Sequence, residues 1–332
     1  QQVKTCSGGL SEWQHNPVGV PQGSTMSSLL FTLYINRIDE PVNFCRTMLY
    51  ADDMQMYIHC SLDTIDNAVN QINADLVMLC KWCKDHGLSL NASKCKPIVL
   101  GTSRMLSNVN LNDILPVTIN GMVLDYEQSV VNLGIRMCST MAWTEQVNYI
   151  HRKVYQSLYR LKRLCFKPNV YIKKLLVSTL IFPFFDYANA VYCDINDELL
   201  QKLQRAQNAC IRYIFNVPID AHITRYYKEL GWLKINERME YNILLQMHKI
   251  IMFGQPDYLF NQYIMMNHVH ARETKFGNVT LQFPLHRTVI YNKSFHVKSI
   301  RLLNGLHNTI KHAPSINLFK KRLKTDLLKR YE

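Results

Sequence analysis

The chain has 332 residues, of which 48% are apolar and 19% are charged, with only 12 Gly and 11 Pro. This composition is typical of a folded globular protein of about two domains, and it excludes collagen-like, low-complexity and disordered chains. Lys and Arg total 38 against 25 Asp and Glu, so the net charge is +13 with neutral His. Such a charge favours a polyanionic partner or an acidic surface over a small neutral substrate.

The longest apolar run, residues 175–185, contains Ser178, Thr179 and Pro183. It is much shorter than the roughly 20 residues of a membrane-spanning helix, so we expect no transmembrane segment and no membrane partner. The first residues show neither an initiator Met nor a signal-peptide pattern. We therefore expect the chain to start inside a longer reading frame, and to be nuclear, cytoplasmic or both, but not secreted.

Ten cysteines are scattered along the chain, which favours reduced thiols over the disulfide framework of a small secreted domain. Cys80 and Cys83 form a C-x-x-C pair with His86 and Cys95 nearby, so a zinc site is one interpretation. Both cysteines also fall on the apolar stripe of a predicted helix, and no second pair follows at zinc-finger spacing. This pattern favours core thiols.

The first half of the chain mixes helix and strand patterns. Apolar spacing predicts a buried helix, apolar on most faces, over residues 27–38, and an amphipathic helix over residues 63–86 that stops at Gly87. Two β-compatible runs within residues 45–60 flank Asp52-Asp53 and predict a hairpin. Short strands are also expected, at residues 98–100, at 117–119 with Asn120-Gly121 as the following turn, and at 130–135.

The charge is divided unevenly between the two halves. Residues 1–142 hold nine Lys and Arg and 12 Asp and Glu, a net charge of −3, whereas residues 143–332 hold 29 and 13, a net charge of +16. The second half has long stretches with a 3.6-residue apolar period, which predict an all-helical part. Helices are expected at 144–165, 168–182, 197–215, 221–230 and 237–253, followed by a basic amphipathic tail at 292–332.

The tetrapeptide Tyr50-Ala51-Asp52-Asp53 occupies the predicted hairpin tip. Two adjacent carboxylates repel each other unless a cation offsets them, so the pattern favours a divalent metal. Tight turns prefer Asn-Gly or Asp-Gly, and a purely structural hairpin does not call for Asp-Asp. An acidic surface turn is the alternative, because Asp is common in turns.

A second motif, G-V-P-Q-G-S, spans residues 19–24 and leads into the first predicted helix, with 25 residues between Ser24 and Tyr50. Glycines allow the backbone to approach a ligand closely, and a loop at a helix N-terminus offers free N–H groups to phosphate or sugar. An ordinary Pro/Gly loop is the alternative. The two motifs in this order are more specific than either alone.

These residues resemble the reverse transcriptases of non-LTR (LINE-type) retrotransposons. The similarity covers palm motif B at residues 19–36, motif C at 50–53, motif D at 87–96 and the primer-grip strand at 132–135, and it continues through thumb-like segments to residue 323. It implies an α+β fold in three parts: a partial polymerase palm with an antiparallel sheet and helices at 1–142, an all-α thumb at 143–253, and a basic helical C-terminal region at 254–332.

The resemblance implies an RNA-directed DNA polymerase, which joins a primer 3′-hydroxyl to the α-phosphate of a dNTP on an RNA template with two Mg²⁺ or Mn²⁺ ions. Asp52 and Asp53 are the implied metal ligands and catalytic carboxylates. Lys94 is implied to contact or protonate the leaving phosphate, with an ordinary solvated Lys as the alternative. The implied nucleotide and template contacts are Pro21, Gln22, Gly23, Ser24 and Tyr50, and the implied primer grip is Leu133 and Gly134.

The helix predicted from Thr144 carries cations that would contact the phosphate backbone of a DNA primer and RNA template without base recognition: Arg152, Lys153, Arg160, Lys162 and Arg163. Solvated charge on a helix is the alternative. Tyrosines at helical spacing are expected in the core rather than stacked on bases, namely Tyr155, Tyr159, Tyr171 and Tyr213.

The chain departs from the family before motif B. The family has a third carboxylate, from motif A, several dozen residues upstream, whereas 18 residues precede Gly19 here and Glu12 is their sole acid. In addition, Ser28 replaces a usual Pro and Arg37 a usual Asp. We therefore expect no independent polymerase activity. A non-catalytic RNA- or DNA-binding relic of a truncated element and a helical protein-interaction module are the alternatives.

Overall fold

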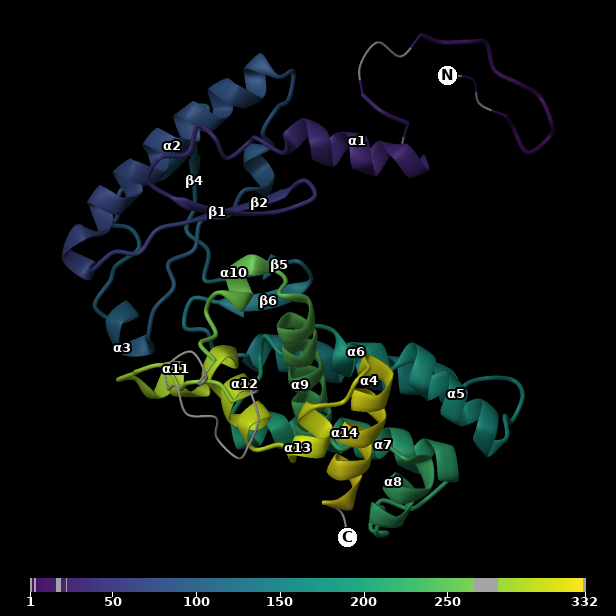
Figure 1. Cartoon of the computed structure of the whole chain (residues 1–332). Coiled ribbons are helices and arrows are strands. Elements are labelled where there is room, and N and C mark those ends of the chain that lie inside the picture. Colours follow the sequence, from purple (N-terminus) through teal and green to yellow (C-terminus); the bar gives the residue numbers. More distant parts are fainter. Residues whose placement is uncertain (1, 3, 16–18, 22, 266–279, 331–332) are drawn as a thin grey trace. The chain divides into compact units, whose positions relative to one another are not determined.

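The computed structural model of the chain describes residues 2, 4–15, 19–21, 23–265 and 280–330 (Figure 1). The chain forms two compact units, Gln1–Val130 and Val131–Glu332. The described residues are α+β, with many helices and small two-stranded sheets. None of the helices in these ranges is long and apolar enough to cross a membrane.

One long helix organises the first unit. Helix α2 spans Ile65–Asp85, and its apolar stripe packs against strand β3. After the helix, Gly87 adopts a φ of 66° and the Leu88 N–H donates to the Cys83 carbonyl at 2.7 Å, which closes the last turn. The helix predicted over residues 63–86 and its stop at Gly87 are confirmed.

Two hairpins flank this helix in the sequence. Strands β1 (Arg46–Tyr50) and β2 (Asp53–Tyr57) are antiparallel, with Tyr50 paired to Asp53 across a two-residue turn. Strands β3 (Val117–Ile119) and β4 (Met122–Leu124) are also antiparallel and turn at Asn120-Gly121, whose φ values of 50° and 81° lie in the left-handed region that Asn and Gly tolerate best. The hairpin predicted within residues 45–60 is confirmed, and so are the strand predicted at 117–119 and the turn after it.

The first helix of the chain, α1 (Thr25–Ile35), is not buried as predicted. Only Ser27 and Ile35 are buried. Burial requires a neighbouring surface as well as an apolar sequence, and the described residues place none over the outer faces of this helix. The following side chains are 48–65% exposed: Met26, Leu29, Leu30, Leu33 and Tyr34.

Shorter elements complete the first unit: 3₁₀ turns η1 (Leu62–Thr64) and η2 (Ala92–Lys94), and helix α3 (Ser103–Leu106). The strand predicted at residues 98–100 is wrong, because this segment is irregular. The Glu127 N–H donates to the Pro97 carbonyl at 2.9 Å, but no ladder follows among the described residues.

The second unit is helical, apart from a hairpin at its start. Strands β5 (Ser129–Asn132) and β6 (Ile135–Cys138) form that hairpin, so the single strand predicted at 130–135 is wrong. Leu133 and Gly134 have φ values of 45° and 80°, and this left-handed backbone reverses the chain in the middle of the segment that was predicted as one strand.

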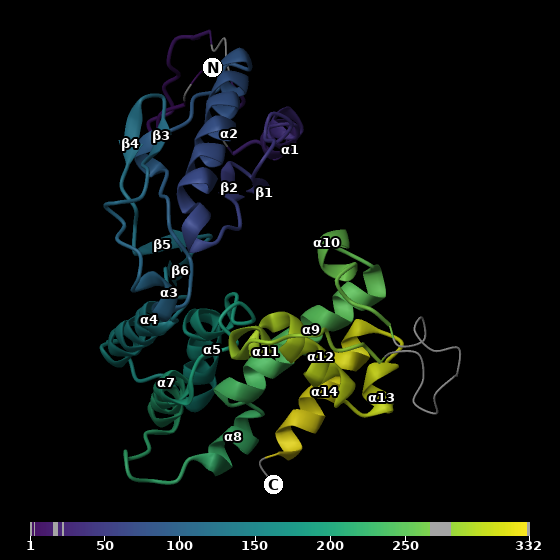
Figure 2. The ribbon, with the colours of Figure 1, turned by 90° about the vertical axis from the view of Figure 1, so that its left-hand side faces the viewer.

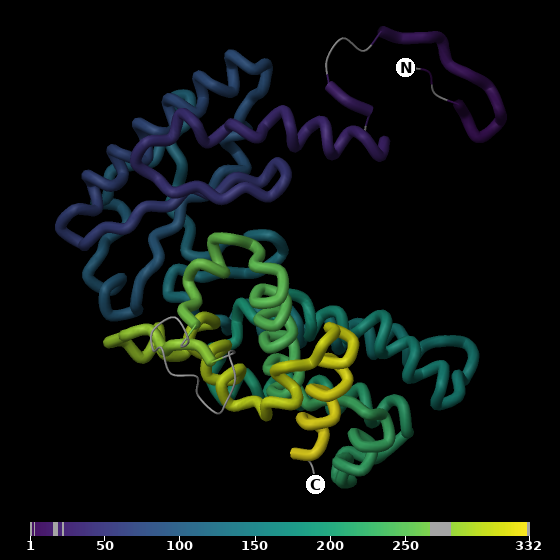
Figure 3. Tube along the Cα trace, viewed as in Figure 1, coloured from purple at the N-terminus to yellow at the C-terminus, as the bar shows by residue number. Residues whose placement is uncertain are grey.

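The helices of the second unit match the predicted ones up to residue 253, with small shifts at their ends (Figures 2 and 3). They are α4 (Thr144–Lys162), α5 (Val170–Leu180), α6 (Phe182–Asp186), α7 (Asp197–Phe215), α8 (Thr224–Leu230) and α9 (Ile235–Phe253). The described residues after 253 add α10 (Asp257–Phe260), α11 (Val289–Lys293), α12 (Phe295–Asn304), α13 (Asn308–Lys311) and α14 (Ile316–Lys329).

Two apolar clusters hold these helices together. The first joins α4, α7 and the start of α9 and includes Val147, Val154 and Ile211. The second joins the rest of α9 to α12 and α14 and includes Met247 and Phe319. Helix α9 contributes to both clusters and therefore connects the helices before residue 253 with those after it.

Candidate functional site

The β1–β2 hairpin ends in two adjacent exposed carboxylates, Asp52 and Asp53. Ala51, in the turn, has a φ of 51°, a left-handed value that is strained for a residue with a Cβ. Tyr50 is 68% exposed beside them. The tip therefore presents two acidic side chains and an aromatic ring to solvent.

Helix α2 fixes the start of this hairpin through Asp75. Its carboxylate accepts the backbone N–H groups of Asn43 at 2.9 Å, Phe44 at 3.0 Å and Cys45 at 2.8 Å, and the residue is only 1% exposed. Burial acts to raise the pKa of Asp75, but hydrogen bonds to its carboxylate outweigh burial and leave the pKa below its usual value.

The same contact acts on the neighbouring thiol. Burial, followed by the hydrogen bond and the negative charge of Asp75, raises the pKa of Cys45 to about 12. The sequence analysis missed Asp75. The available signal is an acid directly before Leu76, which lies on the apolar stripe of an amphipathic helix, since a buried carboxylate at such a position needs donors.

The loop of the second motif leads into α1, and Gly19, Pro21, Gly23 and Ser24 are exposed. Gln22 lies outside the described residues. Ser24 is the N-cap residue of α1, but its side chain makes no capping hydrogen bond. Figure 1 shows α1 running along the β1–β2 hairpin, with the start of the helix on the side of the hairpin tip.

Two hydrogen bonds hold this loop and helix in place. The Ser27 hydroxyl donates to the Pro21 carbonyl at 2.5 Å, which folds the loop back onto the first helical turn. The Tyr34 hydroxyl donates to the His86 carbonyl at the end of α2. Helix α2 is therefore linked both to α1 and to the β1–β2 hairpin.

Lys94 ends the η2 turn and is exposed. In the described part of the chain no ion pair joins Lys94 to Asp52 or Asp53. Its neighbour Lys96 pairs with Glu127 at 2.9 Å. The structure thus places Lys94 on the surface of the first unit without bringing it into contact with the hairpin carboxylates.

The predicted primer-grip residues Leu133 and Gly134 form the β5–β6 turn. The Tyr187 hydroxyl, at the end of α6, donates to the Leu133 carbonyl at 2.6 Å. A Cβ added at Gly134 would lie 3.4 Å from the Tyr187 ring. Sequence reasoning missed Tyr187, because it lies more than 50 residues from the turn that it supports.

Helix α4 presents the predicted cations to solvent. Arg152, Arg160, Lys162 and Arg163 are exposed and Lys153 is half-buried, while the opposite stripe of the helix is in the core. The placement of tyrosines in the core is confirmed for Tyr213 and wrong for three others, since Tyr155, Tyr159 and Tyr171 are 42%, 59% and 73% exposed. Tyr155 and Tyr159 lie off the buried stripe of α4, among its cations.

The acidic ligands of the hairpin do not by themselves form a two-ion site. Two-metal phosphoryl transfer needs carboxylates that hold a pair of ions a few ångströms apart. The tip offers Asp52 and Asp53, and the described residues contain no group of three or more His, Cys, Asp or Glu placed to hold a metal ion. The side chains present therefore do not fit a resident ion pair.

Within the described part of the chain, the C-x-x-C pair also lacks the surroundings of a metal site. Cys80, Cys83, His86 and Cys95 do not form a metal-binding group among the described residues. Burial raises the pKa of the thiols of Cys80, Cys83 and Cys95, which favours the protonated form. All ten cysteines are free thiols. The interpretation of Cys80 and Cys83 as core thiols agrees with these features.

Residues 5–150 match the model of the family described as reverse transcriptase (RNA-dependent DNA polymerase). The matched segment contains both sequence motifs, Lys94 and the β5–β6 turn, and it ends within α4. No curated protein and no solved structure matches the chain. Residues 5–150 are therefore similar to reverse transcriptase domains, a family that acts on a nucleic-acid template and dNTPs and normally uses divalent metal ions.

Proposed function

We propose that the chain is part of the reverse transcriptase of a non-LTR retrotransposon. In this proposal residues 1–142 are a partial palm, 143–253 a thumb and 254–332 a basic C-terminal region. The observation that supports this proposal most strongly is the exposed Asp52-Asp53 pair on a strained hairpin tip, within a segment that matches the reverse transcriptase family. Adjacent exposed carboxylates are the ligands that Mg²⁺ or Mn²⁺ prefers.

Other residues supply the contacts that the reaction requires. Pro21, Gln22, Gly23, Ser24 and Tyr50 bind nucleotide and template, and Leu133 and Gly134 hold the primer. Lys94 meets the leaving phosphate. The substrates are an RNA template, a DNA primer and a dNTP. The exposure of the loop at the start of α1 and of Leu133 in the β5–β6 turn supports these roles.

We also propose that this 332-residue chain has no polymerase activity on its own. Asp52 and Asp53 lack a third carboxylate partner among the described residues. A pair of ions at such a site lacks a bridging ligand, so the primer hydroxyl is neither activated nor positioned.

A primer-extension assay tests this proposal directly. The chain is incubated with poly(rA), labelled oligo(dT) and dTTP, with Mg²⁺ or Mn²⁺. We expect no template-dependent incorporation. Incorporation that is lost in Asp52→Ala, but kept in the control Asp85→Ala on the exposed end of α2, would show a complete site and contradict the proposed inactivity while supporting the polymerase assignment.

The second candidate is a non-catalytic nucleic-acid-binding protein, and the charge distribution favours it. The net charge of +16 lies in residues 143–332, outside the carboxylate hairpin. Binding to an RNA–DNA hybrid that survives Asp52→Ala, and weakens when Arg160, Lys162 and Arg163 are changed to Gln, supports this candidate. A helical protein-interaction module instead requires binding that is insensitive to salt.

A further inference from the structure

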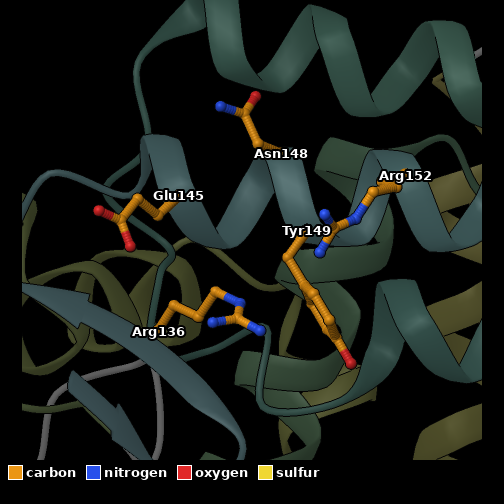
Figure 4. A pocket seen from close by; sticks show the side chains of 5 residues that line it. All are labelled: Arg136, Glu145, Asn148, Tyr149 and Arg152. Carbon is orange, nitrogen blue, oxygen red and sulfur yellow. The ribbon is translucent and has the colours of Figure 1, made fainter. Parts of the chain in front are cut away.

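A pocket of about 340 Å³ opens in the second unit between strand β6 and helix α4 (Figure 4). Its lining residues are Arg136, Glu145, Asn148, Tyr149 and Arg152. Arg136 comes from the β5–β6 hairpin, two residues after the Leu133-Gly134 turn, and the others come from the first half of α4. Two different elements thus bring two guanidinium groups to one hollow.

Arg136 is held from two sides. Its backbone N–H donates to the Gln146 side chain at 3.0 Å, and its guanidinium lies 4.5 Å from the centre of the Tyr149 ring. Lys153 also approaches this ring, at 5.6 Å. Stacking on an aromatic face orients a guanidinium while its N–H edge stays available to a ligand.

The two arginines of the pocket lack acidic partners. Neither Arg136 nor Arg152 takes part in an ion pair in the described part of the chain. Figure 4 shows Arg136 and Arg152 near Tyr149, while the carboxylate of Glu145 points away from both guanidinium groups. Two cations that share a hollow and are not paired with a carboxylate repel each other, and an anion relieves that repulsion.

Further cations surround the pocket. The Lys202 ammonium on α7 donates to the Asn148 side chain at 2.6 Å, which brings a third positive charge to the rim. Arg160 lies eight residues after Arg152 on α4, about 12 Å further along the helix axis. An extended polyanion reaches both positions, whereas a single phosphate ion reaches one.

We propose that this pocket binds one phosphate group of a polynucleotide backbone, with Arg136 and Arg152 donating to its oxygens and Tyr149 positioning Arg136. Planar guanidinium groups match the paired oxygens of a phosphate. The identity of the ligand as a polynucleotide rests on the proposed function. The alternative source of the same chemistry is free phosphate, which the experiment distinguishes.

The test compares two variants with equal net charge. In the pocket variant, Arg136→Gln and Arg152→Gln are combined. In the control, Arg225→Gln and Arg287→Gln remove two exposed charges elsewhere in the unit, and Arg225, like Arg136, stacks on a tyrosine. Fluorescence anisotropy with a labelled 20-nucleotide RNA–DNA hybrid gives Kd at several salt concentrations, with and without inorganic phosphate.

We expect the pocket variant to raise Kd about ten-fold and the control to stay within about two-fold. The log–log salt slope of the pocket variant falls by about 0.9, because the contact to one phosphate is lost. Arg152→Gln alone, which removes a side chain without a hydrogen bond in the described residues, weakens the contact to that phosphate and lowers the slope by less than about 0.9. This single change keeps the test valid if the double variant is unstable.

Equal Kd values and slopes for the pocket and control variants overturn the pocket and leave the proposed function standing. If the wild-type chain does not bind the hybrid, both the assignment of a polynucleotide to the pocket and the proposed function are overturned. Displacement of the hybrid from wild type by millimolar inorganic phosphate, with no such effect on the pocket variant, identifies a free-phosphate site and overturns the polynucleotide assignment.

Discussion

Asp75 is a buried carboxylate whose partners are three backbone N–H groups just before strand β1. A backbone segment held in this way cannot shift without losing hydrogen bonds to a charged acceptor. The position of the Asp52-Asp53 tip therefore depends on a buried side chain of α2.

Substituting Asp75→Asn removes the charge and replaces an acceptor oxygen with a donor. We expect the free energy of unfolding of the first unit to fall by about 2 kcal/mol. Amide hydrogen exchange should accelerate at Asn43, Phe44 and Cys45. Asp85→Asn on the exposed end of α2 is the matched control and should stay within about 0.5 kcal/mol of wild type. Unchanged exchange at residues 43–45 in Asp75→Asn would contradict this role.

The pH dependence follows from the lowered pKa of Asp75 in the folded chain. A carboxylate with a depressed folded pKa contributes stability above its unfolded pKa of about 4, and this contribution is lost as the pH falls through the folded value. The stability difference between wild type and Asp75→Asn should therefore be full at neutral pH and shrink below about pH 4. Urea unfolding at a series of pH values measures it, and a constant difference down to low pH would count against the mechanism.

Tyr187 supports the β5–β6 turn by donating to the Leu133 carbonyl at 2.6 Å. We expect Tyr187→Phe to destabilise this turn by about 1 kcal/mol, the usual net value of one hydrogen bond. The measurement is hydrogen exchange over residues 131–137, which should accelerate. Tyr171→Phe, on a side chain that is 73% exposed, is the control. Equal exchange in both variants would show that the hydroxyl does not hold the turn.

Among the elements, the long amphipathic helices were predictable from the sequence. Helix α2 and helix α7 repeat apolar residues every three or four positions, and the predicted range of α7, 197–215, matches Asp197–Phe215. The β1–β2 and β3–β4 hairpins were predictable because a change of residue type marks each turn. These signals are local, so no knowledge of distant contacts was needed.

The burial or the bounds of other elements depend on neighbouring segments, and these contacts cannot be read from a local sequence pattern. Helix α1 is apolar on most faces but exposed, because no described segment covers it. Residues 130–135 turn at Leu133-Gly134 with the support of a tyrosine from α6. Tyr155 and Tyr159 share helical spacing with core residues, yet they face away from the apolar stripe of α4.

The candidate site shows the same limit. Asp52 and Asp53 were assigned from the hairpin pattern and the family resemblance, and the structure places them at the exposed tip. Arg136 and Tyr149 were not identified, because their contact joins a strand to a helix and is not visible as a motif. The two carboxylates are recognisable from a short sequence pattern. The arginine pocket is recognisable only from the folded structure, because its residues come from two separate elements.

In the whole molecule, the excess of basic residues and the adjacent carboxylates lie in different parts of the chain. The acidic hairpin lies in the first unit, and the net charge of +16 lies in residues 143–332. Such a distribution suits a protein that holds a polyanion with one part and offers carboxylates for metal ions with another. We propose that the chain binds a template–primer duplex through its helical part.

The most direct test of this claim is the salt dependence of hybrid binding. Fluorescence anisotropy of a labelled RNA–DNA hybrid is measured with the wild-type chain and with the combined substitutions Arg160→Gln, Lys162→Gln and Arg163→Gln. We predict binding that weakens steeply with salt, and a log–log slope that falls by up to about 0.9 for each phosphate contact removed. Absence of binding, or binding that neither salt nor these substitutions weaken, would contradict the account.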